Sequence, residues 1–132
     1  MPHEKRIEIR WRDMDAFGHV NNAVFLTYLE ECRDEVMAGA LEGVGDVNDF
    51  VLARVAIDYR RPLTQDDDAV IVSCRVESIG TSSVRTTEEM RTLEGHVAAT
   101  ASSVMVGLRD DGAARPLTGA ERAAFEARVE TA

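Results

Sequence analysis

The hydrophobic period of the sequence changes twice, and no other feature constrains the fold as strongly. Residues 5–12 alternate between apolar and charged side chains, which predicts a half-buried strand. The apolar face of this strand is expected to hold Ile7, Ile9 and Trp11. From Asn22 onward, apolar side chains recur at helical spacing, which predicts an amphipathic helix of roughly five turns capped by Asn21 or Asn22. The apolar positions of this helix are Val24, Tyr28, Leu29, Cys32, Val36, Met37 and Ala40.

Alternation returns after the helix and predicts about four more strands. They cover residues 51–59, 70–76, 83–93 and 96–108. One face of the first is expected to consist of Val51, Ala53, Val55, Ile57 and Tyr59. A short helix near the end of the chain is indicated by Thr118 and Glu121, which have the spacing of a capping box. This order predicts an α+β fold, with one long helix packed on an antiparallel sheet of about five strands.

Composition and charge narrow the function classes. The 132 residues suit one domain, residues 1–132, and a net charge of −9 argues against binding to nucleic acid. A charged N-terminus and the lack of an apolar run of about 20 residues argue against a signal peptide or a membrane span, so we expect a cytoplasmic protein. Cys32 and Cys74 fit buried thiols in a reducing compartment. The histidines are isolated from one another, so no metal site is expected.

A motif is found in residues 11–33, WRDMDAFGHVNNAVFLTYLEECR. This segment resembles the start of hotdog-fold acyl-CoA thioesterases of the 4-hydroxybenzoyl-CoA thioesterase type. The matching features are Asp13-x-Asp15, Gly18-His19-Val20-Asn21-Asn22, Tyr28-Leu29 and Glu31-x-Arg33. The first two also resemble plant-type acyl-carrier-protein thioesterases. Weaker matches follow at residues 57–62 and 79–83.

The resemblance implies a hotdog fold, in which a curved antiparallel sheet wraps around the long helix. It implies hydrolysis of an acyl-CoA without a cofactor, at active sites formed between the subunits of a homodimer or homotetramer. It places the catalytic carboxylate at Asp15, which attacks the thioester or activates water, and it makes the backbone N–H of Asn22 the candidate oxyanion donor. Taken without the motif, Asp15 would be an ordinary turn residue.

Other residues have competing roles. Asp13 fits a structural role, with hydrogen bonds to loop amides, better than a catalytic one. His19 is either a participant in the reaction or a residue that holds the loop by hydrogen bonds. Glu31 either orders water or the Asp15 loop, or it lies on the solvated face of the helix, alone or in an ion pair with Arg33.

Substrate binding is expected from residues outside the helix. Arg60, Arg61 and Arg85 are suited to the phosphates of CoA, because guanidinium groups bind phosphate well. Ser83, in the weaker match at residues 79–83, is also expected to contact substrate.

Other functions stay open beside acyl-CoA hydrolysis. An acyl-carrier-protein thioesterase would need a basic docking face, which a chain of net charge −9 is poorly suited to provide. Hotdog hydratases resemble D-x-N-P-x-H, with His five residues after Asp, whereas His19 follows Asp15 by four. A non-catalytic acyl-CoA binding module is the alternative from another functional class.

Overall fold

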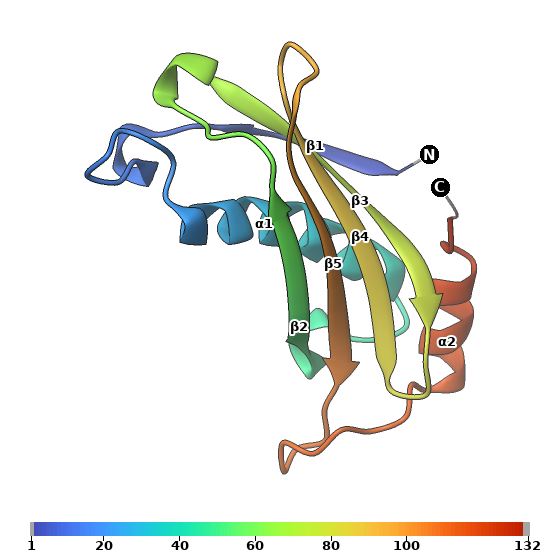
Figure 1. Ribbon diagram of the computed structural model, residues 1–132. Coiled ribbons are helices and arrows are strands. Elements are labelled where there is room, and N and C mark those ends of the chain that lie inside the picture. Colours follow the sequence, from blue (N-terminus) through green and yellow to red (C-terminus); the bar gives the residue numbers. More distant parts are fainter. Residues whose placement is uncertain (1, 131–132) are drawn as a thin grey trace.

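The computed structural model describes residues 2–130 as one curved sheet around a central helix (Figure 1). The strands are β1 (His3–Glu8), β2 (Phe50–Tyr59), β3 (Ala69–Ile79), β4 (Ser83–Thr92) and β5 (Val97–Gly107). The helices are α1 (Asn22–Leu41) and α2 (Gly119–Glu126), and single 3-10 turns cover Trp11–Asp13, Val47–Asp49 and Gln65–Asp67. The expected α+β fold with five strands and one long helix is confirmed, and its hotdog architecture is the one implied by the resemblance.

The sheet is antiparallel throughout and has the strand order β1-β3-β4-β5-β2. The strand β5 lies inside the sheet, flanked by β4 and β2. The helix α1 packs mainly against β3, with β1 and β4 beside it, so the two edge strands have different surroundings. Figure 1 shows β2 in green at the free left edge of the sheet.

The start of α1 follows from its sequence. Asn21 is the N-cap, and its side-chain Oδ1 accepts a hydrogen bond from the N–H of Ala23 at 2.8 Å. All of the apolar positions predicted for this helix are buried except Val24, which is partly buried. The helical period therefore identified the face that meets the sheet.

The first strand is shorter than predicted. Ile7 and Ile9 are buried as expected, but β1 ends at Glu8, and the side chain of Trp11 is 79% exposed. The chain turns away because Asp13 accepts hydrogen bonds from the backbone and guanidinium of Arg10, which close a 3-10 turn over Trp11–Asp13. Placing Trp11 on the buried face was therefore wrong.

A β-bulge in β2 changes which residues share a face. In the pairing with β5, Leu52 lies opposite Met105 and Arg54 lies opposite Val104, so Ala53 is the extra residue. Residues directly opposite in an antiparallel pair point to the same side, so Val55, Ile57 and Tyr59 face the α1 side and Val51 faces the other. The prediction that all five alternating residues share one face was therefore wrong for Val51.

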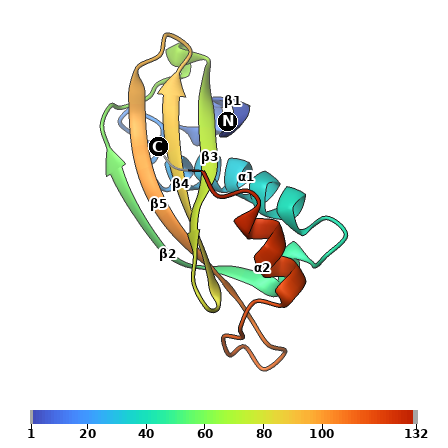
Figure 2. The ribbon, with the colours of Figure 1, turned by 90° about the vertical axis from the view of Figure 1, so that its right-hand side faces the viewer.

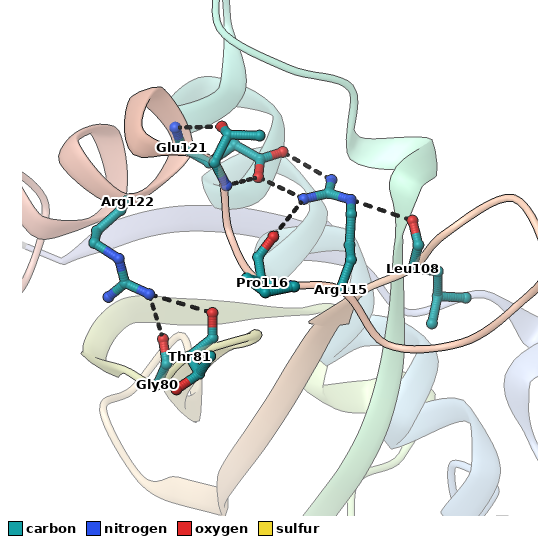
Figure 3. A network of polar contacts seen from close by, with 8 residues as sticks. Gly80, Thr81, Leu108, Arg115, Pro116, Glu121 and Arg122 are labelled. Carbon is teal, nitrogen blue, oxygen red and sulfur yellow. Dashed lines mark hydrogen bonds and ion pairs between the residues drawn. The ribbon is translucent and has the colours of Figure 1, made fainter.

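The second helix packs beside α1 and β3 (Figure 2). Its N-cap Thr118 and the side chain of Glu121 form the predicted capping box. Arg115 donates two hydrogen bonds to the carboxylate of Glu121, at 2.8 and 2.9 Å, and one to the carbonyl of Leu108. Arg122 donates to the carbonyl oxygens at the β3–β4 turn (Figure 3). These contacts tie the C-terminal segment to two strand ends.

A buried ion pair joins α1 to the sheet. The Arg33 guanidinium donates to Glu88 on β4 at 3.1 Å, and Ser103 on β5 donates to the same carboxylate oxygen at 2.8 Å. Both charged side chains are at most 3% exposed, and burial raises the pKa of Glu88, although the hydrogen bonds from Ser103 and Arg33 oppose this effect. Of the alternatives for Glu31, the ion pair with Arg33 does not form, and its exposed carboxylate lies on the helix surface 3.9 Å from Lys5 Nζ.

We predict that Glu88→Ala lowers the free energy of unfolding by about 3–5 kcal/mol, because it leaves the Arg33 guanidinium buried without a countercharge and with only the hydroxyl of Ser103 as acceptor. Glu89→Ala is the matched control: its carboxylate lies 3.3 Å from Arg91 but is 40% exposed, and its loss should cost about 1 kcal/mol or less. Urea unfolding measures both. Equal losses in the two variants would contradict a structural role for the buried pair.

Candidate active site

The loop between β1 and α1 folds into a tight turn around Asp15. The N–H of Asp15 donates to the carbonyl of His19 at 2.8 Å, and Gly18 adopts a positive φ of 80°, which favours glycine. One carboxylate oxygen, Oδ1, accepts from the backbone N–H groups of Phe17 at 2.9 Å and His19 at 3.3 Å. Within residues 2–130 no donor contacts Oδ2 of Asp15. The loop therefore orients the carboxylate and leaves one oxygen open.

Asp13 anchors this loop to the helix. Its buried carboxylate accepts a hydrogen bond of 2.5 Å from the hydroxyl of Tyr28 on α1, and others from Arg10. Its backbone carbonyl accepts from the N–H of Asn21 at 2.9 Å. Burial on its own would raise the pKa of Asp13, but the hydrogen bonds from Tyr28 and Arg10 outweigh burial and hold that pKa below its usual value. These contacts give Asp13 the structural role that was expected.

Asn22 is the first residue of α1, where backbone N–H groups have no acceptor inside the helix. Within residues 2–130 no acceptor contacts its N–H. Its carbonyl accepts a hydrogen bond of 2.9 Å from the hydroxyl of Tyr59 at the end of β2. The helix start is thus joined to the edge of the sheet, with a free N–H beside the Asp15 loop.

These elements surround one cleft of about 510 Å³. It is lined by Asp15, Phe17, His19, Val20, Asn22, Phe25, Tyr59, Arg60, Arg61 and Pro62. The rings of Phe25 and Tyr59 meet edge to face, with centroids 5.2 Å apart. The structure therefore brings together five of the seven predicted catalytic or substrate-binding residues: Asp15, His19, Asn22, Arg60 and Arg61.

The two arginines at the cleft differ in whether their guanidinium groups have partners. Arg60 donates from Nε to the hydroxyl of Thr100 at 3.2 Å and lies 3.9 Å from the carboxylate of Asp58. The exposed side chain of Arg61 contacts no partner within residues 2–130, so its guanidinium is open to a ligand. The ring of His19 is likewise exposed and makes no hydrogen bond within the same residues.

Two predicted substrate-binding residues, Ser83 and Arg85, lie elsewhere, and Ser83 shows how far from the cleft they are. It pairs with Val106 of β5, whereas Tyr59 at the cleft pairs with Ala99, seven residues away along β5. Ser83 also lies on the sheet face opposite α1, as does Arg85, whose guanidinium donates to Ser102. Within one chain neither residue reaches the cleft.

Sequence reasoning missed the aromatic lining of the cleft. Phe17 is 86% exposed at the tip of the loop, and Phe25 had no assigned role. Phe17 could have been found from the sequence, because it lies two residues after Asp15, the candidate catalytic carboxylate, in the same motif. The rings of Phe25 and Tyr59 meet only because of the strand order, and no pattern in the neighbouring residues predicts this contact.

Comparison with known proteins decides the family. The model of the thioesterase-like superfamily matches residues 9–128. The chain belongs to this superfamily. It is 31% identical over 101 residues to the long-chain acyl-CoA thioesterase FadM of Escherichia coli (strain K12), covering 74% of this chain and 76% of FadM. The protein is thus a hotdog-fold thioester hydrolase.

Solved structures agree with this assignment. A thioesterase from Thermus thermophilus, complexed with coenzyme A and Zn, is 35% identical and superposes with a TM-score of 0.83, covering 96% of this chain and 92% of that one. A predicted thioesterase from Bacillus stearothermophilus is 25% identical, with a TM-score of 0.88 over 100% and 99% of the two chains.

Two further features of the described residues bear on the site. Across residues 2–130, no three side chains among His, Cys, Asp and Glu are grouped so that they could hold a metal ion. No helix in this part of the chain is long and apolar enough to cross a membrane.

We predict that Tyr28→Phe lowers the free energy of unfolding by about 1.5–3 kcal/mol, because the lost hydroxyl donates to a buried carboxylate. Tyr59→Phe is the matched control, since its hydroxyl donates to a backbone carbonyl at an exposed position, and it should cost about 1 kcal/mol or less. Urea unfolding of both variants tests the difference. If Tyr28→Phe were as stable as the parent, Asp13 would not anchor the loop as described.

Proposed function

We propose that this thioesterase hydrolyses an acyl-CoA to a free carboxylic acid and CoA, with Asp15 as nucleophile or general base. One observation carries the proposal: an oriented carboxylate and an unoccupied helix N–H line the same partly apolar cleft. The named activity of FadM and the coenzyme A bound in the Thermus thermophilus structure support this substrate class.

Asp15 is suited to act on the thioester carbon. Two backbone amides hold Oδ1, so Oδ2 is the oxygen that attacks the carbonyl carbon or removes a proton from water. Direct attack forms an acyl–carboxylate anhydride and releases the CoA thiolate, and water then hydrolyses the anhydride. In the general-base route, water adds to the carbonyl carbon and Asp15 takes its proton. The two routes share the same position of the carboxylate.

The start of α1 is suited to receive the developing negative charge. The thioester carbonyl oxygen becomes an oxyanion in either route, and a free N–H at a helix N-terminus stabilises such a charge. Asn22 offers that N–H, and the hydrogen bond from Tyr59 to its carbonyl holds the peptide chain of the first turn in place. His19 is the second candidate for contact with the thioester, since its ring is free at the cleft.

The remaining residues that line the cleft suit two different parts of the substrate. The apolar side chains of Phe17, Phe25 and Tyr59 suit the acyl group. The open guanidinium of Arg61, with Arg60 beside it, suits the phosphates of CoA, and Ser83 stays a prediction that a single chain does not support.

An acyl-carrier-protein thioester is the other candidate substrate, whereas the membership of the chain among thioester hydrolases rules out the non-catalytic binding role that the sequence left open. The net charge of −9 disfavours an acidic carrier protein. The open oxygen of Asp15 favours an enzyme over a binding module. We also propose a cytoplasmic location, supported by the free thiols of Cys32 and Cys74, and a homodimer or homotetramer.

We predict that Asp15→Asn lowers kcat for acyl-CoA hydrolysis about 10²-fold or more while ligand binding is retained, because it removes the reacting carboxylate oxygen. Asp34→Asn, which neutralises an exposed carboxylate on α1, is the matched control and should leave kcat unchanged. Thiol release with a panel of aliphatic and aromatic acyl-CoAs gives kcat, and calorimetric titration with CoA gives binding. Turnover by Asp15→Asn at the parent rate would exclude Asp15 as the catalytic group.

We predict that Arg61→Met raises KM for acyl-CoA about tenfold with little change in kcat, because one charge-assisted contact to phosphate is worth about 1.4 kcal/mol. The matched control is the N-acetylcysteamine thioester of the same acyl group, which has no phosphate, and its KM should not change. An equal rise for both substrates would assign Arg61 to the acyl group or to the fold.

A further inference from the structure

We propose that Phe25 and Tyr59 determine the length of the acyl group, because their rings form an aromatic wall that closes one end of the cleft. The acyl groups that fit are then short ones, and a longer chain meets the wall. This inference rests on the proposed thioesterase reaction and adds the residues that select among its substrates. It holds whether Asp15 attacks the thioester or activates water.

The side chain of Tyr59 is fixed at its hydroxyl and at its ring. The hydroxyl donates a hydrogen bond of 2.9 Å to the carbonyl of Asn22, the first residue of α1. The ring meets that of Phe25 edge to face, with centroids 5.2 Å apart. An alkyl chain between two side chains needs about 4 Å to the carbon atoms on each side, which rings in contact do not leave. The two contacts therefore close the gap between the start of α1 and the end of β2.

The helix side of the wall cannot give way easily. The side chain of Phe25 is 2% exposed, and Val20 beside it in the cleft is buried as well. Leu29, one turn further along α1, is fully buried and does not line the cleft. Close-packed side chains leave no room for a ligand between them. The cleft consequently ends at Phe25 and does not extend along the helix.

An apolar strip of two side chains, Val55 and Ile57, lies beyond the wall. Both point to the same side of β2 as Tyr59, and both are only half-buried. Neither lines the cleft, whereas Tyr59 and residues 60–62 do. Along β2, Tyr59 thus separates the strip from the cleft. Methylene groups are stabilised when they leave water for an apolar surface, so the strip would suit a longer acyl chain if the wall were opened.

Thiol release with straight-chain acyl-CoAs from butanoyl to decanoyl tests this limit. In the parent, kcat/KM should rise about fourfold for each methylene buried in the cleft and fall once the chain meets the wall. In Tyr59→Ala, the ratio of kcat/KM for decanoyl-CoA to that for butanoyl-CoA should rise about tenfold or more, the gain from burying two further methylenes. Because this ratio compares two substrates of one variant, it cancels any loss of rate caused by the missing hydrogen bond to Asn22.

Tyr59→Phe is the matched control. It keeps the ring and removes the hydroxyl, so its ratio should equal that of the parent even if its rates are lower. Phe25→Leu shortens the wall from the helix side without removing the apolar side chain, and it should raise the ratio about fourfold, as for one methylene. An unchanged ratio in both Tyr59→Ala and Phe25→Leu, or a ratio raised equally in Tyr59→Phe, would overturn the wall.

A double variant tests where the longer chain lies. Ile57→Thr places a hydroxyl on the strip, and alone it should leave the parent ratio unchanged, because the wall keeps the acyl chain away from it. Combined with Tyr59→Ala, it should remove most of the gain for decanoyl-CoA, and a full gain in the double variant would overturn the strip as the path. A parent that prefers decanoyl-CoA would overturn the length limit alone, whereas no thiol release from any acyl-CoA would overturn the proposed function as well.

Discussion

The hydrogen bond from Tyr28 to the buried carboxylate of Asp13 is the contact on which the candidate active site depends. It joins the loop that follows β1 to the second turn of α1, and the carbonyl of Asp13 holds the N–H of Asn21 at the helix cap. A charged acceptor makes such bonds roughly twice as strong as neutral ones. Because loop and helix start are fixed to each other, Asp15 and the N–H of Asn22 keep their relative positions.

Two carboxylates of one short motif thus acquire opposite roles from their surroundings. Asp13 is buried and saturated with donors, so it can only support structure. Asp15 is half-buried, is held through one oxygen by the loop amides and exposes the other to the cleft. The difference arises from the turn at Gly18, which directs the second carboxylate outward.

The asymmetric packing of α1 explains why the cleft lies at the β2 edge. The helix covers β3 and parts of β1 and β4 and is fixed there by the buried pair of Arg33 and Glu88. Apart from the buried Phe50 at the start of β2, the side chains of this strand that face the helix side are consequently only half covered or exposed. The end of this uncovered strip, at Tyr59, meets the start of α1 and forms one wall of the cleft.

The sequence was sufficient for features that are encoded locally. The helix start at Asn21 and Asn22 and the capping box at Thr118 follow from side chains within a few residues of each other. It was insufficient where the outcome depends on distant partners: Arg33 reaches Glu88, 55 residues away, and Phe25 meets Tyr59 only after the sheet has formed.

The bulge at Ala53 shows a more specific reason for failure. Val51, Ala53 and Val55 are all apolar, so the period of two continues unbroken in the sequence while the strand itself changes face. A bulge moves side chains across the sheet without altering the pattern when the residues on both sides of it are hydrophobic. The face on which each residue of β2 lies could therefore be assigned only from the structure.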